Sequence, residues 1–307
     1  MGAAIGVDVG GTKIRAARVD SAGKILAHWV RSTPSTIPGV LAAIDAAIME
    51  LDGDDVQAIG IGAPGRVDVG AGAVLSGGFV NLAGPPLATR LDSLAGRPLF
   101  VDNDGTMTLV AEARVGAGAG AVHLLMLTIG TGIGGAAISG GKILRGAGGA
   151  GQFGHITIAY GGAPCACGRL GCLETTSSGT ALRRLIDATN FGPETTAASL
   201  LADDSEHARA LLLRWAGPLR EGIDSYIAAF DPDRVILGGG LGAAAAAAVA
   251  RIPGKSPWFQ RPVVAARLGD SAGVIGAGLA ALDAARCSAS SSSTAFRLPA
   301  RARSRGL

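Results

Sequence analysis

The chain has 307 residues, of which 48% are hydrophobic and 17% are charged, and its formal net charge is +3. A chain of this length predicts about two domains with buried cores, and the hydrophobic fraction excludes disorder over most of it. The positive excess is too small to indicate a nucleic-acid partner.

Strands and helices alternate along the first 115 residues. Apolar runs bounded by turn residues predict the strands, and apolar residues at helical spacing predict the helices. In chain order they are strands at 4–9, 14–19 and 24–30, a helix at 38–51, strands at 56–62 and 99–102, and a helix at 106–114. This alternation favours an α/β layer fold.

The remainder of the chain continues the alternation. The predicted elements are strands at 122–128, 133–139 and 235–237, and helices at 179–189, at 205–230, from 243 and at 276–286. Residues 287–307 are rich in serine and then in arginine, which predicts a disordered tail. We therefore expect an N-terminal domain at 1–115, a larger C-terminal domain at 116–286 and a tail at 287–307.

The cysteines and apolar segments indicate a cytoplasmic protein. Four unevenly spaced cysteines argue against a disulfide framework. Asp8 interrupts the N-terminal apolar stretch, so we expect no signal peptide. The uncharged stretch 115–141 contains many glycines and is typical of two strands around a turn, not of a membrane span. We therefore predict no membrane partner.

Three glycine-containing turns follow predicted strands. Their residues are Asp8, Gly10, Gly11, Thr12 and Lys13, then Thr128, Gly130, Thr131 and Gly132, and finally Gly238, Gly239 and Gly240. Glycine lets the backbone approach a phosphate, threonine can donate a hydrogen bond to it, and an aspartate can hold Mg²⁺ through water. One Gly-Gly turn alone is also typical of a plain hairpin. Ligands of α/β sheets collect at strand ends, so three such turns favour a phosphate site.

Asn103 and Asp104 follow the predicted strand at 99–102. A carboxylate beside an amide at a strand end can orient a sugar hydroxyl and take its proton. Asp104 also precedes the predicted helix at 106–114, where it would be a good N-cap. Both interpretations, base and cap, stay open at this point.

His155, Cys165, Cys167 and Cys172 form the most specific pattern in the sequence. One imidazole and three thiolates make a closed tetrahedral Zn²⁺ site, which is structural because it leaves no position for water. The alternatives are a buried histidine bonded to backbone and a cluster of reduced core cysteines. Cysteines clustered in this way in a cytosolic chain favour the metal. Glu174, two residues after Cys172, would be held rigidly by that site.

These patterns together resemble the ROK family of bacterial sugar kinases. The resemblance covers residues 4–285 and rests above all on the family's GH and CxCGxxGCxE signature, here Gly154-His155, Cys165-Ala-Cys167-Gly168 and Gly171-Cys172-Leu-Glu174. It implies a two-domain actin-like ATPase (ribonuclease H-like) fold with an interdomain cleft. It also implies a homodimer whose substrates are a small-molecule sugar and ATP.

The resemblance assigns roles to individual residues. Asp104 is the general base that deprotonates the 6-hydroxyl of the sugar for in-line attack on the γ-phosphate of ATP. The residues expected to bind the other hydroxyls or to line the sugar pocket are Gly65, Asn81, Asn103, Gln152, His155 and Glu174. ATP and Mg²⁺ are expected at the three glycine turns. His155 binds zinc through one nitrogen and keeps the other for the sugar.

Two departures from the family pattern concern the choice of sugar. The family usually has Glu where this chain has Gln152, a change that removes a charge and turns one acceptor oxygen into a donor amide. The common Asn-Asp-Ala-Asn becomes Asn-Asp-Gly-Thr at 103–106, and the tryptophan that often follows Asn-Leu is missing after Leu82. The base is retained, so we expect activity. The substrate would be a sugar with a different pattern of hydrogen-bonding groups at one carbon, such as an amino-sugar or another epimer.

The resemblance predicts an ATP-dependent hexose 6-kinase of glucokinase type. The alternative of the same class is an amino-sugar kinase, for instance of kanosamine (3-amino-3-deoxyglucose) in antibiotic biosynthesis. Kinases of N-acetylmannosamine or fructose, and polyphosphate as the donor, are further alternatives.

The alternatives from other classes are non-catalytic. A sugar-responsive ROK repressor has a helix-turn-helix domain before the first glycine turn, and here that turn begins at Gly10, so we expect no such domain. The arginines at 297–305 make only a weak electrostatic patch. A catalytically silent sugar-binding protein is the third hypothesis, and the retained Asp104 argues against it.

Overall fold

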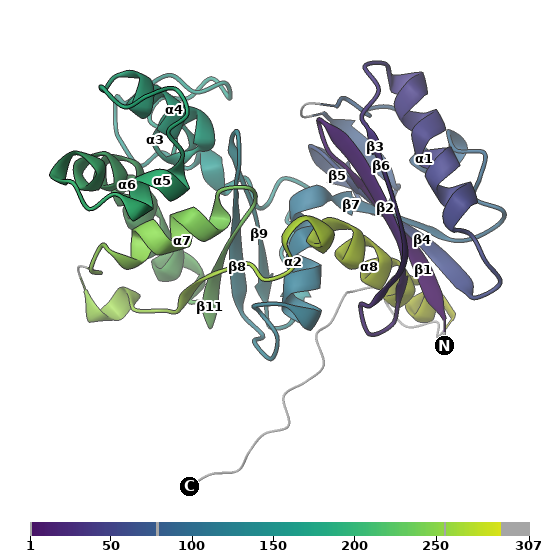
Figure 1. Cartoon of the computed structure of the whole chain (residues 1–307). Helices are drawn as coiled ribbons and strands as arrows, with labels where there is room; N and C mark the ends of the chain where they lie inside the picture. The colour runs from purple at the N-terminus through teal and green to yellow at the C-terminus, as the bar shows by residue number, and fades with distance from the viewer. Residues whose placement is uncertain (1, 78–79, 255, 290–307) are drawn as a thin grey trace, which may run out of the picture. The chain divides into compact units, whose positions relative to one another are not determined.

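The computed structural model describes residues 2–77, 80–254 and 256–289. The contacts of the described residues form two compact units (Figure 1): unit 1 takes those in 2–120, 141–150 and 270–289, and unit 2 takes those in 121–140 and 151–269. The division differs from the expected domains at 1–115 and 116–286. The chain returns to unit 1 twice, once at 141–150 and again with its last helix.

Unit 1 is built on a five-stranded sheet in the order β3-β2-β1-β4-β7. The strands are β1 (Ala3–Val9), β2 (Lys13–Asp20), β3 (Ile25–Ser32), β4 (Val56–Ala63) and β7 (Leu99–Asn103). β1, β2 and β3 pair antiparallel, whereas β1, β4 and β7 run parallel. The carboxyl ends of β1, β4 and β7 therefore share one edge of the sheet.

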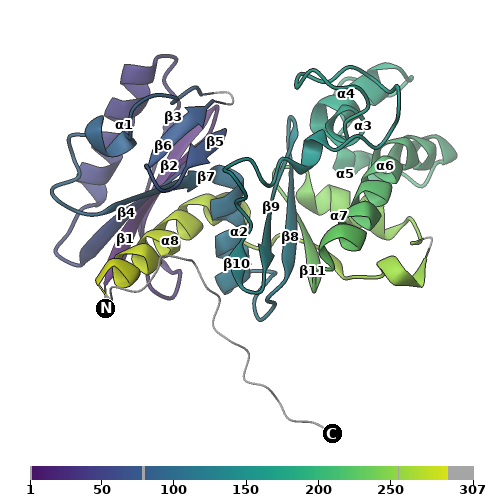
Figure 2. The same ribbon diagram turned by 180° about the vertical axis from the view of Figure 1, so that it is seen from behind.

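Helices cover both faces of this sheet (Figure 2). They are α1 (Ile37–Leu51), α2 (Asp104–Val115) and α8 (Ala272–Ala289). Side chains of β1 alternate between the two faces, because successive residues of a strand point to opposite sides. Ile5 and Val7 join Ile44 of α1 in one apolar cluster, and Ala4 joins Leu282 of α8 in another. The sheet is therefore buried between α1 and α8.

Close packing of α8 on the sheet depends on glycine. A Cβ atom on Gly6 would lie 2.0 Å from the carbonyl oxygen of Val274, and one on Gly60 would lie 2.0 Å from that of Ala277. Any larger residue at either position would push the helix away from the strands.

Unit 2 has a second sheet, in which β9, β8, β11 and β12 are neighbours in that order. Its strands are β8 (Leu124–Ile129), β9 (Ile133–Ser139), β11 (Arg234–Gly238) and β12 (Val263–Ala265). Its helices are α3 (Glu174–Ser177), α4 (Gly179–Asp187), α5 (Ala197–Ala202), α6 (Glu206–Phe230) and α7 (Gly242–Ala250). Trp215 and Tyr226 of α6 are fully buried in the core of this unit.

Every strand and helix predicted from the sequence is present, with its ends shifted by a few residues. The elements that the pattern missed have six residues or fewer: β5 (Arg66–Asp68), β6 (Ala73–Ser76), β10 (Lys142–Ile143), β12, α3 and α5. Short 3₁₀ turns lie at Leu87–Thr89, Phe153–His155, Pro257–Phe259 and Gly269–Ser271. Such segments are too short for a hydrophobic period to show.

The predicted tail begins too early. Residues 287–289 belong to α8, and 290–307, where the rest of the predicted tail falls, lie outside the described residues. Within the described ranges, each helix is too short or too polar to cross a membrane.

Candidate active site

The junction of β7 and α2 carries Asn103 and Asp104. The helix begins at Asp104, two residues earlier than predicted, so Asn103 is its N-cap; of the two interpretations left open for Asp104, the cap is wrong. The Oδ1 atom of Asn103 accepts the backbone N–H of Thr106 at 3.2 Å, and its Nδ2 atom donates to the carbonyl of Gly65 at 2.9 Å. Because Asn103 caps the helix, capping no longer explains the carboxylate of Asp104.

Asp8 lies near the end of β1, at the sheet edge where β7 also ends. Burial raises the pKa of its carboxyl to about 7, the nearby Asp104 adds to the rise, and Arg15 opposes it. Burial likewise raises the pKa of Asp104 above its ordinary value. A cation would relieve the repulsion between two such carboxylates, so this pair suits Mg²⁺.

The first glycine turn joins β1 to β2. Gly10 donates its N–H to the carbonyl of Lys13 at 3.1 Å, and the hydroxyl of Thr33 donates to the carbonyl of Gly10 at 2.7 Å. Gly11, Thr12 and Lys13 are exposed. The turn is a hairpin, as the plain interpretation predicts, and its exposed tip is open to a ligand.

The second and third glycine turns meet in unit 2. The N–H of Leu241 donates to the carbonyl of Ile129 at 2.9 Å, which joins the end of β8 to the segment after β11. Gly239 has a φ of +78°, and a Cβ atom there would lie 2.6 Å from the carbonyl oxygen of Ile129. Glycine is therefore needed where these two loops touch.

A third loop of this group, at 178–180, was not predicted. Gly179 donates its N–H to the carbonyl of Gly130 at 2.7 Å, and the hydroxyl of Thr180 donates to the backbone carbonyl of Thr131 at 2.8 Å. Ser178 caps α4, and Trp215 holds it by donating from Nε1 to its carbonyl at 3.1 Å. The available signal was a serine, a glycine and a threonine at a helix start.

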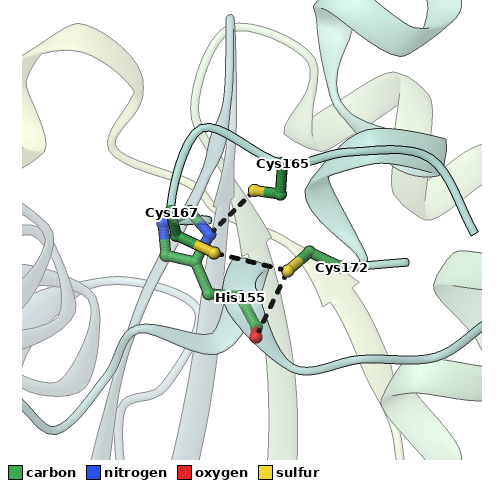
Figure 3. A group of neighbouring side chains, drawn as sticks. All are labelled: His155, Cys165, Cys167 and Cys172. Atoms are coloured by element: carbon green, nitrogen blue, oxygen red, sulfur yellow. Dashed lines mark hydrogen bonds between the residues drawn. The ribbon is translucent and has the colours of Figure 1, made fainter. Parts of the chain in front are cut away.

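His155 and the three cysteines come together as predicted (Figure 3). Their ligand atoms all lie within 4.8 Å of one another, with 3.4 Å between Cys165 Sγ and His155 Nδ1 and 3.6 Å between the sulfurs of Cys167 and Cys172. A tetrahedral zinc with Zn–S bonds of about 2.3 Å sets its sulfurs roughly 3.8 Å apart. The four residues therefore fit such an ion with small movements, and Nδ1 is the ring nitrogen of His155 that contacts Cys165.

The backbone around His155 is fixed by buried neighbours. A Cβ atom on Gly154 would lie 2.1 Å from the carbonyl oxygen of Ile133, so the Gly-His pair packs directly against β9. The hydroxyl of Tyr226 donates to the carbonyl of Phe153, and the two rings lie 5.1 Å apart between centroids. His155 thus stands on a rigid 3₁₀ turn.

Glu174 is the first residue of α3 and reaches the second glycine turn. Its Oε2 atom accepts the N–H of Ile133 at 2.8 Å, and a Cβ atom on Gly132 would lie 2.3 Å from the same oxygen. Its Oε1 atom lies 3.9 Å from Cys165 Sγ. Glu174 therefore contacts both the cysteine cluster and the turn at 128–132.

The remaining sugar candidates lie in both units. In unit 1, a Cβ atom on Gly65 would clash with the carbonyl of Ser76 at 1.9 Å, and Oδ1 of Asn81 accepts the N–H of Ala83 at 3.1 Å. In unit 2, the side chain of Gln152 is exposed and its backbone carbonyl accepts the N–H of His155 at 3.1 Å. Unit 1 thus collects Asp8, Gly65, Asn103 and Asp104, and unit 2 collects the cysteine cluster, Glu174 and the other glycine turns.

Comparisons with known proteins identify the family of the chain. The profile of the ROK family matches residues 4–284. The chain is 34% identical to a glucokinase of Halalkalibacterium halodurans, over 89% of this chain and 93% of that protein. It is also 34% identical to a kanosamine kinase of Amycolatopsis mediterranei, over 78% of this chain and 80% of that protein.

A solved structure extends the likeness to the fold. A ROK family glucokinase from Streptomyces griseus, crystallised with glucose and AMPPNP, matches with a TM-score of 0.76 and 34% identity, covering 92% of this chain and 99% of that chain. The predicted α/β fold of the two-domain actin-like ATPase type is confirmed. The chain belongs to the ROK family.

Proposed function

We propose that this protein is an ATP-dependent hexose 6-kinase of glucokinase type. Its similarity to glucokinases along nearly the whole chain supports a sugar kinase. One observation supports the assignment of Asp104 as the base. At the start of α2, Asn103 caps the helix and Asp104 is its first residue, so the carboxylate of Asp104 is not needed as the cap. A carboxylate there lies at the positive end of the helix dipole, which helps to hold it ionised against burial.

The reaction moves one phosphoryl group and one proton. The 6-oxygen of the sugar attacks the γ-phosphorus of ATP in line, the bond from that phosphorus to the β–γ bridging oxygen breaks, and ADP leaves. The proton of the 6-hydroxyl passes to the carboxylate of Asp104. A base works best when its pKa lies near the operating pH, and burial moves the pKa of Asp104 in that direction.

The phosphates are held by backbone and by charge. The glycine turns at 10–13, 128–132 and 238–240 offer N–H groups and little steric hindrance, and Asp8 is the carboxylate that would hold Mg²⁺ through water. When bound, Mg²⁺ neutralises charge on the β- and γ-phosphates. Phosphoryl transfer depends mostly on such positioning and charge neutralisation.

Zinc is proposed as a structural ion that holds sugar-binding residues of unit 2 in place. His155, Cys165, Cys167 and Cys172 would be its ligands, with Nδ1 of His155 directed to the cluster. Nε2 of the same ring would bind a sugar hydroxyl, and Glu174 would bind another. A closed site of this type rigidifies the segment between Gly154 and Glu174.

An amino-sugar kinase is the second candidate. Gln152 is exposed and stands where the family usually has Glu, and one relative at 34% identity is a kanosamine kinase. Loss of a carboxylate does not by itself favour a cationic sugar, so glucose remains the leading substrate. A homodimer, a cytoplasmic location and the use of ATP rather than polyphosphate also stand as proposals.

The test is a comparison of kcat/KM for glucose and for 3-amino-3-deoxyglucose with ATP and Mg²⁺. A clear preference for glucose is expected. A preference for the amino-sugar that reverses in Gln152→Glu would instead assign the protein to the second candidate. Turnover of neither sugar, and of no other hexose with ATP or polyphosphate, would overturn the proposed function.

A further inference from the structure

An ion pair in unit 1 includes Asp102, which precedes the proposed base Asp104 by two residues. The Nη2 atom of Arg145 and the Oδ2 atom of Asp102 are 2.5 Å apart. The side chain of Asp102 is only 6% exposed, and that of Arg145 is 30% exposed. Burial raises the pKa of Asp102, and the charge of Arg145 opposes this rise. A carboxylate so deeply buried requires its partner, because an unpaired buried charge is strongly destabilising.

On one side, the pair is connected to the start of α2. The second oxygen of Asp102, Oδ1, accepts the N–H of Asn103 at 2.7 Å. Asn103 in turn caps α2 and donates to the carbonyl of Gly65. A continuous series of contacts therefore runs from Arg145 to the turn of the chain that orients Asp104.

On the other side, Arg145 organises the segment at 141–150. Its carbonyl accepts the N–H of Gly148 at 3.0 Å and that of Ala150 at 3.3 Å, so the backbone folds back around it. A Cβ atom on Gly148 would lie 3.5 Å from the carbonyl of Val67, which places this segment beside β5. The chain then continues within two residues to Gln152 and from there to His155.

We propose that Arg145 and Asp102 are positioning residues for the sugar. Within unit 1, one guanidinium–carboxylate contact anchors Asn103, Gly65 and Asp104 to the segment at 141–150. This inference rests on the proposed kinase function for its kinetic consequence. The pair contacts neither sugar nor phosphate in this assignment, so it acts through the residues that it holds.

The experiment compares Arg145→Met, Arg145→Lys and Asp102→Asn in the full-length protein. For Arg145→Met we expect kcat/KM for glucose to fall about 100-fold, because small displacements of reacting groups cost that much. Lys keeps the charge but loses the planar fork, so Arg145→Lys should recover part of the loss. The KM for ATP should stay within about twofold, since the pair anchors sugar residues and not the glycine turns.

A matched control separates positioning from simple loss of stability. Arg97 and Asp52 form an ion pair in the same unit at 2.8 Å, with side chains 20% and 34% exposed. Arg97→Met should lower the melting temperature but leave the glucose parameters unchanged. If Arg145→Met does not fold, Arg145→Lys and Asp102→Asn provide the same comparison.

Hydrogen exchange supplies a readout that does not depend on turnover. Faster exchange at amides 103–106 in the Arg145 variants, with no change there in the Arg97 variant, is expected. If the wild type phosphorylates no sugar but this exchange pattern appears, the proposed function fails and the positioning role stands. Equal effects of Arg145→Met and Arg97→Met on the melting temperature, on the glucose parameters and on exchange at 103–106 would overturn the inference.

Discussion

Glu174 Oε2 accepts a hydrogen bond from the backbone nitrogen of Ile133 at 2.8 Å. The contact joins the residue that follows the cysteine cluster to the end of the turn between β8 and β9. The carboxylate of Glu174, which is proposed to bind the sugar, thus also holds the turn at 128–132, which is proposed to bind the phosphates of ATP. Sugar binding and ATP binding are therefore expected to depend on each other through this one side chain.

Two substitutions of Glu174 separate its roles. Gln keeps a carbonyl oxygen that accepts the N–H of Ile133, whereas Ala keeps neither the charge nor the acceptor. Both variants should raise the KM for the sugar, and only Glu174→Ala should also raise the KM for ATP. Steady-state kinetics in both substrates would check this. An unchanged KM for ATP in Glu174→Ala would show that the loop does not need the contact.

Replacing the proposed base should separate stability from activity. Asp104→Asn should lower kcat by about 10²- to 10⁴-fold, the usual contribution of a general base, while sugar binding measured by calorimetry persists. Because burial raises the pKa of Asp104, its ionised form costs stability at neutral pH. The neutral amide should therefore raise the melting temperature.

Asp203→Asn is the control for that variant. Asp203 is half-buried, and hydrogen bonds from Ser205 lower the pKa of its carboxyl. Its loss should leave kcat unchanged and should not stabilise the protein. Full turnover in Asp104→Asn would refute the assignment of the base.

The raised pKa of Asp8 leads us to expect that the protein becomes less stable as the pH rises toward 7. Burial raises its pKa from 3.8 in the unfolded chain to about 7. The folded state therefore holds the proton more tightly, and this stabilisation is complete below pH 3.8 and is lost as the pH rises to about 7. Asp8→Asn should match the wild type near pH 4 and melt at a higher temperature at pH 8. Melting curves recorded without added Mg²⁺ and without a chelator, which would also remove the proposed zinc, would measure the difference, and added Mg²⁺ should reduce it for the wild type.

Metal analysis tests the cysteine cluster. We expect about one zinc per chain in the purified protein, as one closed four-ligand site requires. Cys172→Ser should lose the metal and lower the melting temperature strongly, because Cys172 is fully buried. Cys287→Ser, outside the cluster, should keep it. A folded wild type without metal would refute the site.

The longer strands and helices could be predicted from the sequence, because the spacing of apolar residues indicates which face of each element is buried. The start of α2 was misplaced, since Asn103 and Asp104 are both good caps and only the backbone decides which one is used. The contact of Arg145 with Asp102 spans 43 positions and that of Glu174 with Ile133 spans 41. No local pattern encodes such pairs, so the residues of the candidate site could be named from the sequence but their connections could not.

The return of α8 to unit 1 sets an order of events during synthesis. All segments of unit 2 have been made by Gly269, whereas the sheet of unit 1 waits for residues 272–289 to cover the face with Ala4 and Ala58. Gly6 and Gly60 leave room on that face for the backbone of the helix. Unit 1 contains the first strand of the chain, yet its core can be completed only after every segment of unit 2 has been synthesised.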